Sequence, residues 1–324
     1  MKLQNIPIDH SVGAILIHNI VGADGRKIFS KGRVITAQDA EQLRALGKEN
    51  VYAAMLDPDD VREDDAAARL ARAVAGEQIE LSKPSGGRVN FYAASNGFLQ
   101  INRDALHRLN ELDGVTLATI ARYSAVKPRK MFATLKTVGL ALPESILRQA
   151  EEIIATRGQA MSIASVQNQK VAIILTGSAD GKQRTQEMFL PPIRARIEAL
   201  GAQVVAEEFT SENANAIQEA IYAVLDRGAQ MIILAGETSV MDADDITPRG
   251  IKQAGGAIEL YGAPVEPGNL LLLAYRGDVP IIGAPGCVKS RETNVVDLIL
   301  PRLLIGERVT RADVIEMAEG GLLL

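Results

Sequence analysis

The second half of the chain alternates continuous apolar runs with amphipathic stretches. The runs "KVAIILT", "AQMIILAG" and "NLLLLAYR" carry apolar residues at consecutive positions, whereas "ENANAIQEAIYAVLDRG" has helical periodicity. Consecutive apolar residues are typical of strands that are buried on both faces. A parallel sheet with helices on both faces accommodates this alternation. We therefore predict an α/β fold for residues 166–324, with a mostly parallel sheet covered by helices.

Residues 1–165 show a less regular pattern and are predicted to form an α+β module. "GAILIHNI" alternates like a strand, and Thr36 is suited to cap a helix that ends at Gly47. Further helices are predicted after the acidic run "DPDDVREDD", around 103–112 and in "ESILRQAEEIIATRG". The small, polar stretch 161–169, "MSIASVQNQ", is predicted to be a linker between the two domains.

Composition excludes several classes of function. With 35 basic and 40 acidic residues the formal net charge is −5, which argues against a general nucleic-acid binder. One cysteine, Cys287, permits neither an internal disulfide nor a CxxC motif. Residues 1–20 are too polar for a signal peptide or a membrane span. We expect a cytoplasmic protein without nucleic-acid or membrane partners.

Three predicted strands, in "KVAIILT", "AQMIILAG" and "VPIIGAPG", are followed by loops rich in small residues: "TGSADG", "AGETS" and "GAPGCVKS". Ligands of open parallel sheets bind at the carboxyl ends of strands, so these loops are expected to line one pocket. Gly177, Gly236 and Gly286 would let a phosphate or a pterin approach the backbone closely. Ordinary turn formation remains the alternative for each glycine taken alone.

The stretch "AGETSVMDADDITPRG" concentrates acids directly after a buried strand. Thr247 as N-cap and Pro248 as first helical residue predict a helix start, with Asp244 or Asp245 favoured by the positive helix end. Two acids remain beside a predicted anion site, where they would repel the ligand unless a cation lay between them. Mg²⁺ held by Asp245 and Asp242 is therefore predicted.

In order along the chain, "LTGSAD", "AGETSVMDADDITP", "EPGN" and "VPIIGAPGCVKS" resemble the motifs of the molybdopterin-binding fold. That family includes molybdopterin adenylyltransferase, molybdopterin molybdotransferase and the competence-damage-inducible protein. The resemblance covers about residues 169–324, and "GAILIHNI" and "KGRVITAQDAEQLRALG" resemble the N-terminal part of bacterial molybdopterin-binding proteins. Three departures stand out: "AGET" replaces "GGxG", Asn269 replaces a basic residue, and "PGCV" replaces "PGNP".

The resemblance implies a set of functional residues. Asp245 would be the functional acid, assisted by Asp244. The pterin-binding positions would be Gly177, Ser178, Gly236, Glu237, Thr238 and Ser239, and the molybdate side would include Pro267, Gly268, Asn269, Ala284, Pro285, Gly286 and Cys287. Thr247, Lys289 and Ser290 are further candidates for cofactor binding, with Lys289 as the expected source of positive charge.

Three functions follow from these observations and remain open at the level of sequence. The chain could be a Mg²⁺-dependent enzyme that transfers molybdate or an adenylyl group to molybdopterin. It could instead be a non-catalytic carrier that delivers the cofactor to a molybdoenzyme or a maturation protein, because the lost basic and "GNP" features concern turnover more than binding. An unrelated small ligand is the third reading. Family likeness also implies a homo-oligomer.

Overall fold

The computed structural model describes the chain except for residues 23, 238–239, 241, 243 and 324. It divides into two compact units, Met1–Ala164 and Ser165–Leu324, which are described separately. Within the described residues, no helix has the length and apolar character needed to cross a membrane.

The first unit begins with a small hydrophobic cluster around β1 (Lys2–Pro7), β2 (Ile15–Leu16) and β5 (Asn50–Met55), which pair in the order β1-β5-β2. The predicted helix is confirmed as α1 (Ala37–Ala45). Its N-cap Thr36 accepts a hydrogen bond from the Asp39 N–H, and the Asp39 carboxylate accepts one from the Thr36 N–H. A hairpin of β3 (Ile20–Val21) and β4 (Lys27–Phe29) and a short 3-10 helix, η1 (Ile8–His10), complete this part.

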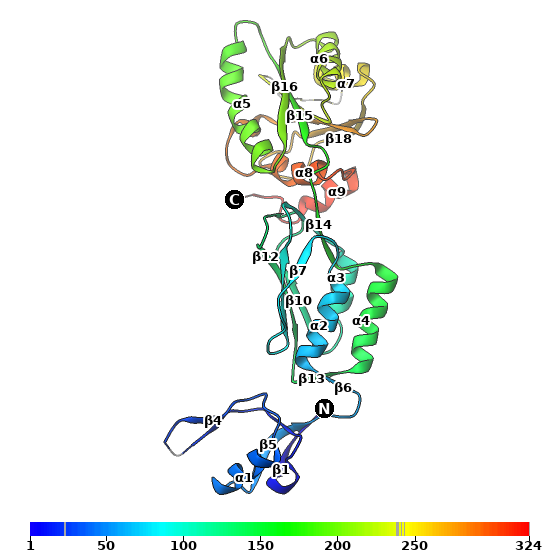
Figure 1. Ribbon diagram of the computed structural model, residues 1–324. Coiled ribbons are helices and arrows are strands. Elements are labelled where there is room, and N and C mark those ends of the chain that lie inside the picture. Colours follow the sequence, from blue (N-terminus) through cyan, green and yellow to red (C-terminus); the bar gives the residue numbers. More distant parts are fainter. Residues whose placement is uncertain (23, 238–239, 241, 243, 324) are drawn as a thin grey trace. The chain divides into compact units, whose positions relative to one another are not determined.

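A second cluster fills the rest of the first unit, where helices pack on antiparallel strands. One sheet has the order β10-β12-β8-β7, another the order β11-β9-β14, and β13 pairs with β6. The strands are β6 (Asp60–Arg62), β7 (Ile79–Leu81), β8 (Arg88–Ala93), β9 (Gly97–Ile101), β10 (Val115–Thr119), β11 (Ala125–Val126), β12 (Met131–Thr137), β13 (Ala141–Pro143) and β14 (Met161–Ala164). The helices are α2 (Glu63–Val74), α3 (Arg103–Asn110) and α4 (Glu144–Arg157) (Figure 1).

The predicted linker at 161–169 is wrong in its first part. Residues 161–164 form β14, which pairs antiparallel with β9. Met161 and Ile163 are buried while their neighbours are half-buried, so this polar-looking stretch has one apolar face that the sheet takes up.

The predicted mostly parallel sheet of the second unit is confirmed. Six strands lie in the order β16-β15-β17-β20-β19-β18. β15, β16, β17 and β20 run parallel, and β18 and β19 are antiparallel additions at one edge. The strands are β15 (Lys170–Thr176), β16 (Gln203–Thr210), β17 (Met231–Gly236), β18 (Ala257–Tyr261), β19 (Leu272–Arg276) and β20 (Val279–Gly283).

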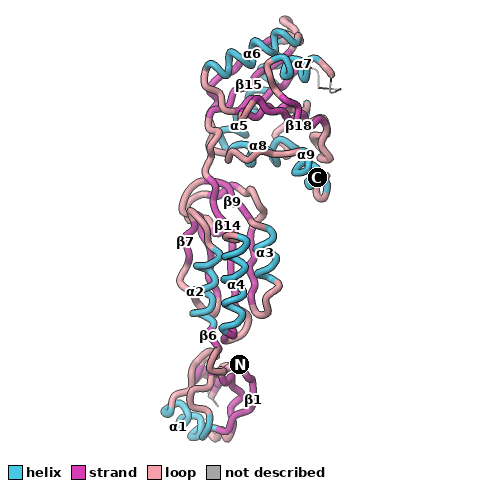
Figure 2. The backbone as a smooth tube through the Cα atoms, turned by 90° about the vertical axis from the view of Figure 1, so that its right-hand side faces the viewer, coloured by secondary structure: helices cyan, strands magenta, loops and turns pink. Residues whose placement is uncertain are grey.

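Helices cover both faces of this sheet (Figure 2). On one face, side chains of α5 (Lys182–Ala199) and α8 (Val295–Leu304) join those of the strands in one apolar cluster. On the other face, α6 (Ala214–Asp226) and α7 (Ile246–Gln253) contribute to a second cluster. A short 3-10 helix, η2 (Gly286–Lys289), follows β20, and α9 (Arg311–Ile315) and η3 (Glu316–Ala318) end the chain.

Two predicted helix details are corrected. α7 begins at Ile246 with Asp245 as N-cap, so Thr247 is not the cap and Pro248 is the third helical residue. Proline is tolerated there because the first N–H groups of a helix have no intrahelical acceptor in any case. Pro301 lies inside α8, and the helix continues through it.

A buried arginine, Arg302, stabilises the last part of the second unit. The Arg302 side chain is 5% exposed and donates hydrogen bonds to Glu307 at 2.5 Å and to Asp313 at 2.6 Å. Burial tends to raise the pKa of Asp313, but hydrogen bonds from Thr310 and Arg302 outweigh it and lower that pKa to about 2. The ionised carboxylate of Asp313 therefore stabilises the fold.

This pKa predicts acid sensitivity of the second unit. Because the folded pKa of Asp313 lies below the ordinary value of 3.8, its contribution is fully present above about pH 4 and is lost as the pH falls toward 2. We expect Asp313→Asn to be less stable than wild type in urea denaturation at pH 6. The difference should shrink steadily between pH 4 and pH 2, and a difference independent of pH would contradict the assignment.

Candidate functional site

Three loops follow strands that run in the same direction, so all three leave the sheet at the carboxyl ends of these strands. β15 ends at Thr176 and β17 at Gly236, and these two residues are paired in the parallel register. β20 ends at Gly283, paired with Leu234, and the Ala284 N–H donates to the Leu234 carbonyl at 2.7 Å. The predicted ligand loops thus start side by side.

The first two loops are joined by the side chain of Glu237. Its Oε2 accepts hydrogen bonds from the Ser178 N–H at 3.2 Å and from the Ser178 hydroxyl at 3.3 Å. Its Oε1 lies 2.9 Å from the buried Thr185 hydroxyl, whose single proton is shared with the Gly181 carbonyl at 3.0 Å. The hydrogen bond from the Ser178 N–H has the largest effect on the pKa of Glu237, and the hydrogen bond from the Thr185 hydroxyl has the next largest. Both lower this pKa below its usual range, so the carboxylate is ionised at neutral pH.

Three glycines leave room for close contacts where these loops meet. A Cβ on Gly181 would lie 1.8 Å from Glu237 Oε1, and one on Gly177 would lie 2.9 Å from Glu237 Cδ. A Cβ on Gly236 would lie 2.0 Å from Thr176 Oγ1. Each of the three glycines therefore permits a close approach that another residue would disturb.

The acidic turn is organised by its own backbone. One Asp242 side-chain oxygen accepts the Asp244 N–H at 2.8 Å, and the Asp245 N–H donates to the Asp242 carbonyl at 3.2 Å. The Asp245 carboxylate accepts the Ile246 N–H at 2.7 Å as the cap of α7. Asp244 is exposed and forms an ion pair with Lys252 at 3.1 Å. The structure thus brings Asp242 and Asp245 into one turn and directs Asp244 to a lysine.

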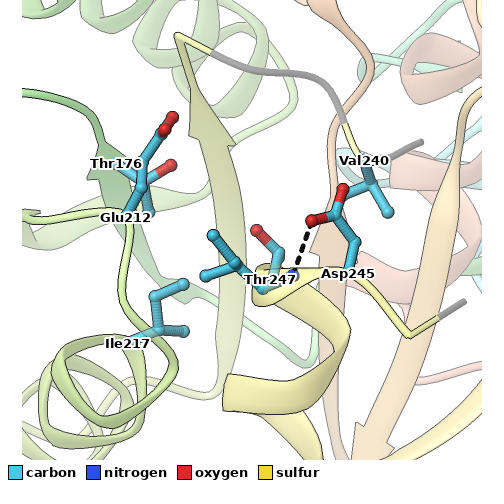
Figure 3. Close-up of a pocket in the computed structure, with 7 residues that line it drawn as sticks. Thr176, Glu212, Ile217, Val240, Asp245 and Thr247 are labelled. Carbon is cyan, nitrogen blue, oxygen red and sulfur yellow. Dashed lines mark hydrogen bonds between the residues drawn. The ribbon is translucent and has the colours of Figure 1, made fainter. Parts of the chain in front are cut away.

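A small cavity of about 10 Å³ lies between this turn and the end of β15 (Figure 3). Its lining residues are Thr176, Glu212, Ile217, Val240, Asp245, Ile246 and Thr247. This volume accommodates about one water molecule. A pterin therefore does not fit inside it, and would have to lie over the exposed surface of the loops.

Tyr261 is a further polar neighbour of the acidic turn. Its hydroxyl donates a hydrogen bond to the Val240 carbonyl at 2.8 Å. Burial raises the pKa of this phenol, and the negative charges of Asp242 and Asp245 add to the effect. Tyr261 therefore stays a neutral donor that holds the backbone beside the acids.

The residues expected on the molybdate side lie in two other places. Pro267 and Gly268 pack against the start of α8: the Val295 N–H donates to the Pro267 carbonyl at 3.1 Å, and a Cβ on Gly268 would meet Val295 Cγ1 at 2.4 Å.

The segment after β20 starts at the sheet edge with Pro285 and Gly286 but soon leaves it. The Val288 carbonyl accepts from Arg196, which lies near the end of α5 rather than at its first turn. Lys289, which follows, is exposed, and the Ser290 hydroxyl accepts the Glu292 N–H at 3.1 Å.

Two sequence-predicted residues, Thr238 and Ser239, lie outside the described part of the chain. Four polar residues of this region were not predicted: Thr176, Thr185, Glu212 and Tyr261. Thr185 follows Gly181 by one helical turn, and its complete burial as a hydroxyl-bearing residue is visible only in the fold. Tyr261 is the last residue of β18 and lies 21 positions from Val240 in the chain, so no local motif marks it.

The described residues contain no group of three or more histidine, cysteine or acidic side chains placed to hold a metal ion. A Mg²⁺ site needs fewer protein ligands, because the ion commonly keeps several waters and binds one or two carboxylates together with a substrate phosphate. Asp242 and Asp245, which share one turn, match that sparse donor set. They do not form a complete metal site by themselves.

Comparison with known protein families supports the resemblance for the second unit. Residues 172–304 match the family model described as "Probable molybdopterin binding domain", and residues 5–55 match one described as a domain of unknown function. The first match runs from β15 into the last turn of α8. The second unit therefore carries a domain of the molybdopterin-binding family. No curated protein matches the chain.

Several solved structures are similar to the chain. A molybdopterin biosynthesis MoeA protein from Pyrococcus horikoshii is 12% identical, with a TM-score of 0.32 and coverage of 94% of this chain and 75% of that one. The molybdopterin biosynthesis enzyme MoaB from Thermus thermophilus is 17% identical, with a TM-score of 0.33 and coverage of 48% and 99%. The protein CinA from Thermoplasma acidophilum is 16% identical, with a TM-score of 0.29 and coverage of 42% and 96%.

Proposed function

We propose that the second unit binds molybdopterin over the loops that follow β15 and β17, and that the chain takes part in molybdenum cofactor biosynthesis in the cytoplasm. The match of residues 172–304 to the molybdopterin-binding family carries this proposal. The matched segment contains all three strand-end loops and the acidic turn. The glycines of these loops give a phosphate-bearing pterin access to the backbone.

In this proposal the chain's own groups position the ligand. Ser178 offers its N–H and hydroxyl to an anionic group, and Gly177, Gly181 and Gly236 leave the backbone accessible. Asp245 and Asp242 would hold Mg²⁺, which would supply the positive charge between these acids and the ligand phosphate. The affinity for the pterin should then rise with Mg²⁺ concentration, and an affinity independent of Mg²⁺ would exclude this role.

As an enzyme, the chain would transfer molybdate or an adenylyl group to the bound pterin. Such chemistry depends mainly on positioning and charge stabilisation, with Asp245 as the functional acid and Asp244 assisting it. Incubation of the purified protein with molybdopterin, Mg²⁺ and either molybdate or a nucleotide tests this directly. A product that depends on one of the two second substrates identifies the reaction.

A carrier function is the second candidate, and two observations favour it. Glu237 places a negative charge among the donors of the first loop, and Lys289, the expected cation, follows a segment that packs near the end of α5. A carrier would bind the pterin, form no product in the assay, and pass the cofactor to a molybdoenzyme or maturation protein. A homo-oligomer is part of either proposal, and sedimentation of the purified chain tests it.

Asp245→Asn is expected to lower pterin binding. Asparagine caps helices as well as aspartate does, so α7 should be retained while the negative charge is lost. We expect the pterin content of protein purified from molybdopterin-producing cells to fall roughly tenfold, the effect of one charge-assisted contact. The extract is denatured and oxidised, and the fluorescent pterin is quantified per chain.

Asp278→Asn is the matched control, because Asp278 is exposed in the hairpin between β19 and β20. This hairpin precedes β20 and therefore lies at the opposite end of the strands from the three loops. It should retain the wild-type pterin content. Equal contents in all three proteins would remove Asp245 from the site.

A further inference from the structure

The first turn of α5 lacks the negative group that helix starts usually attract. This 18-residue helix has Gly181 as N-cap, which provides no side-chain hydrogen bond, and its first turn contains no acidic residue. It opens instead with Lys182, Gln183 and Arg184. The helix dipole adds to this positive charge. The start of α5 therefore favours an anion from another part of the chain.

Glu237 supplies that anion from the end of another strand. Its carboxylate takes hydrogen bonds from the Ser178 N–H, the Ser178 hydroxyl and the Thr185 hydroxyl, and the charge of Arg184 also favours its ionised form. Ser178 and Glu237 are 59 positions apart in the chain. The contact is thus a property of the fold and not of a local turn.

The Glu237 carboxylate fills the space that Gly177 and Gly181 leave by having no side chain, and this space is called the recess below. A side chain on Gly181 would overlap Glu237 Oε1, and one on Gly177 would press on Glu237 Cδ. The recess combines glycine, backbone N–H and hydroxyl donors at a helix start, which are the groups that bind a phosphate oxygen. A carboxylate oxygen and a phosphate oxygen would use the same donors here.

We infer that Glu237 is a self-blocking residue, whose carboxylate occupies the anion recess of the proposed pterin site and must leave before a phosphate group can bind. The two anions cannot share the recess because of their charges. Glu237 is exposed on its other side, so rotation of its side chain opens the recess without unfolding. This inference rests on the proposed function in that it concerns regulation of the same site.

The test is a titration of the full chain with inorganic phosphate, in which binding is monitored through the amide NMR shifts of Ser178 and Gly181. Glu237→Ala should bind phosphate roughly tenfold more tightly than wild type, because no internal carboxylate competes for the donors. Glu237→Gln keeps the length of the side chain but lacks the charge, and its affinity should lie between the two. Glu219→Ala removes one exposed carboxylate from α6, on the other face of the sheet, and should match wild type.

The outcomes separate this inference from the proposed function. Phosphate affinity that is unchanged in both Glu237 variants overturns the inference, and then Glu237 only links the two loops. If wild type nevertheless binds molybdopterin, the proposed function stands. Tighter phosphate binding by Glu237→Ala confirms the self-blocking contact, even if no variant binds the pterin and the proposed function fails.

Discussion

Arg302→Ala is expected to destabilise the second unit by about 3 kcal/mol, the usual cost of removing one partner of a buried ion pair. The Arg302 side chain is 5% exposed and faces two carboxylates, Glu307 and Asp313, that are 27% and 28% exposed. Its loss would leave two partly buried negative charges without their cation. Hydrogen exchange of the β15 and β17 amides, measured by mass spectrometry, reports the opening free energy of this unit directly.

Arg194→Ala provides the control for the loss of an arginine. Arg194 pairs with Glu207 on the surface, where its side chain is 45% exposed, and such pairs contribute about 0–1 kcal/mol. Exchange in this variant should remain near wild type. If Arg302→Ala behaved in the same way, the buried pair would not be what stabilises the end of the chain.

Gly236→Ala is expected to destabilise the same unit by about 1–3 kcal/mol through overpacking. Gly236 and Thr176 are neighbours in the parallel register, and an alanine Cβ would lie 2.0 Å from Thr176 Oγ1 and 2.9 Å from the Thr176 carbonyl oxygen. The ends of β15 and β17 must then move apart. We expect faster amide exchange in both strands and a lower pterin content, because the two loops no longer meet.

A double variant identifies the cause of this effect. Thr176→Ala removes the hydroxyl that the new methyl group would strike, so Gly236→Ala combined with Thr176→Ala should recover part of the lost stability. Strictly additive effects of the two changes would mean that the close approach is not responsible.

Much of the second unit could be predicted because its signals are local. Strands such as β15 and β17 are buried on both faces, so residues 171–175 and 231–235 are all apolar and the pattern has few alternatives. The signal for the start of α1 was also local, since the side chains of Thr36 and Asp39 each accept a hydrogen bond from the other's backbone N–H. The start of α7 was missed because Asp245 and Thr247 are both good caps, and a proline fits at more than one position of a first turn.

The central contact of the site could not be predicted from the sequence. Glu237 departs from the family pattern of "GGxG", but nothing near it in the chain shows that its carboxylate reaches the start of α5. That contact needs the parallel register of β15 and β17, which brings Ser178 and Thr185 beside it. Likewise, β14 was missed because its pairing with β9 is long-range and its residues are small and polar in part.

The central claim is that the second unit binds molybdopterin, and a direct binding titration tests it most simply. The full chain is purified from cells that cannot make molybdopterin, and the reduced pterin is added by equilibrium dialysis under anaerobic conditions with Mg²⁺. We predict saturable binding of one pterin per chain, weakened in Asp245→Asn and unchanged in Asp278→Asn. Absence of saturable binding to the folded wild-type chain would contradict the claim.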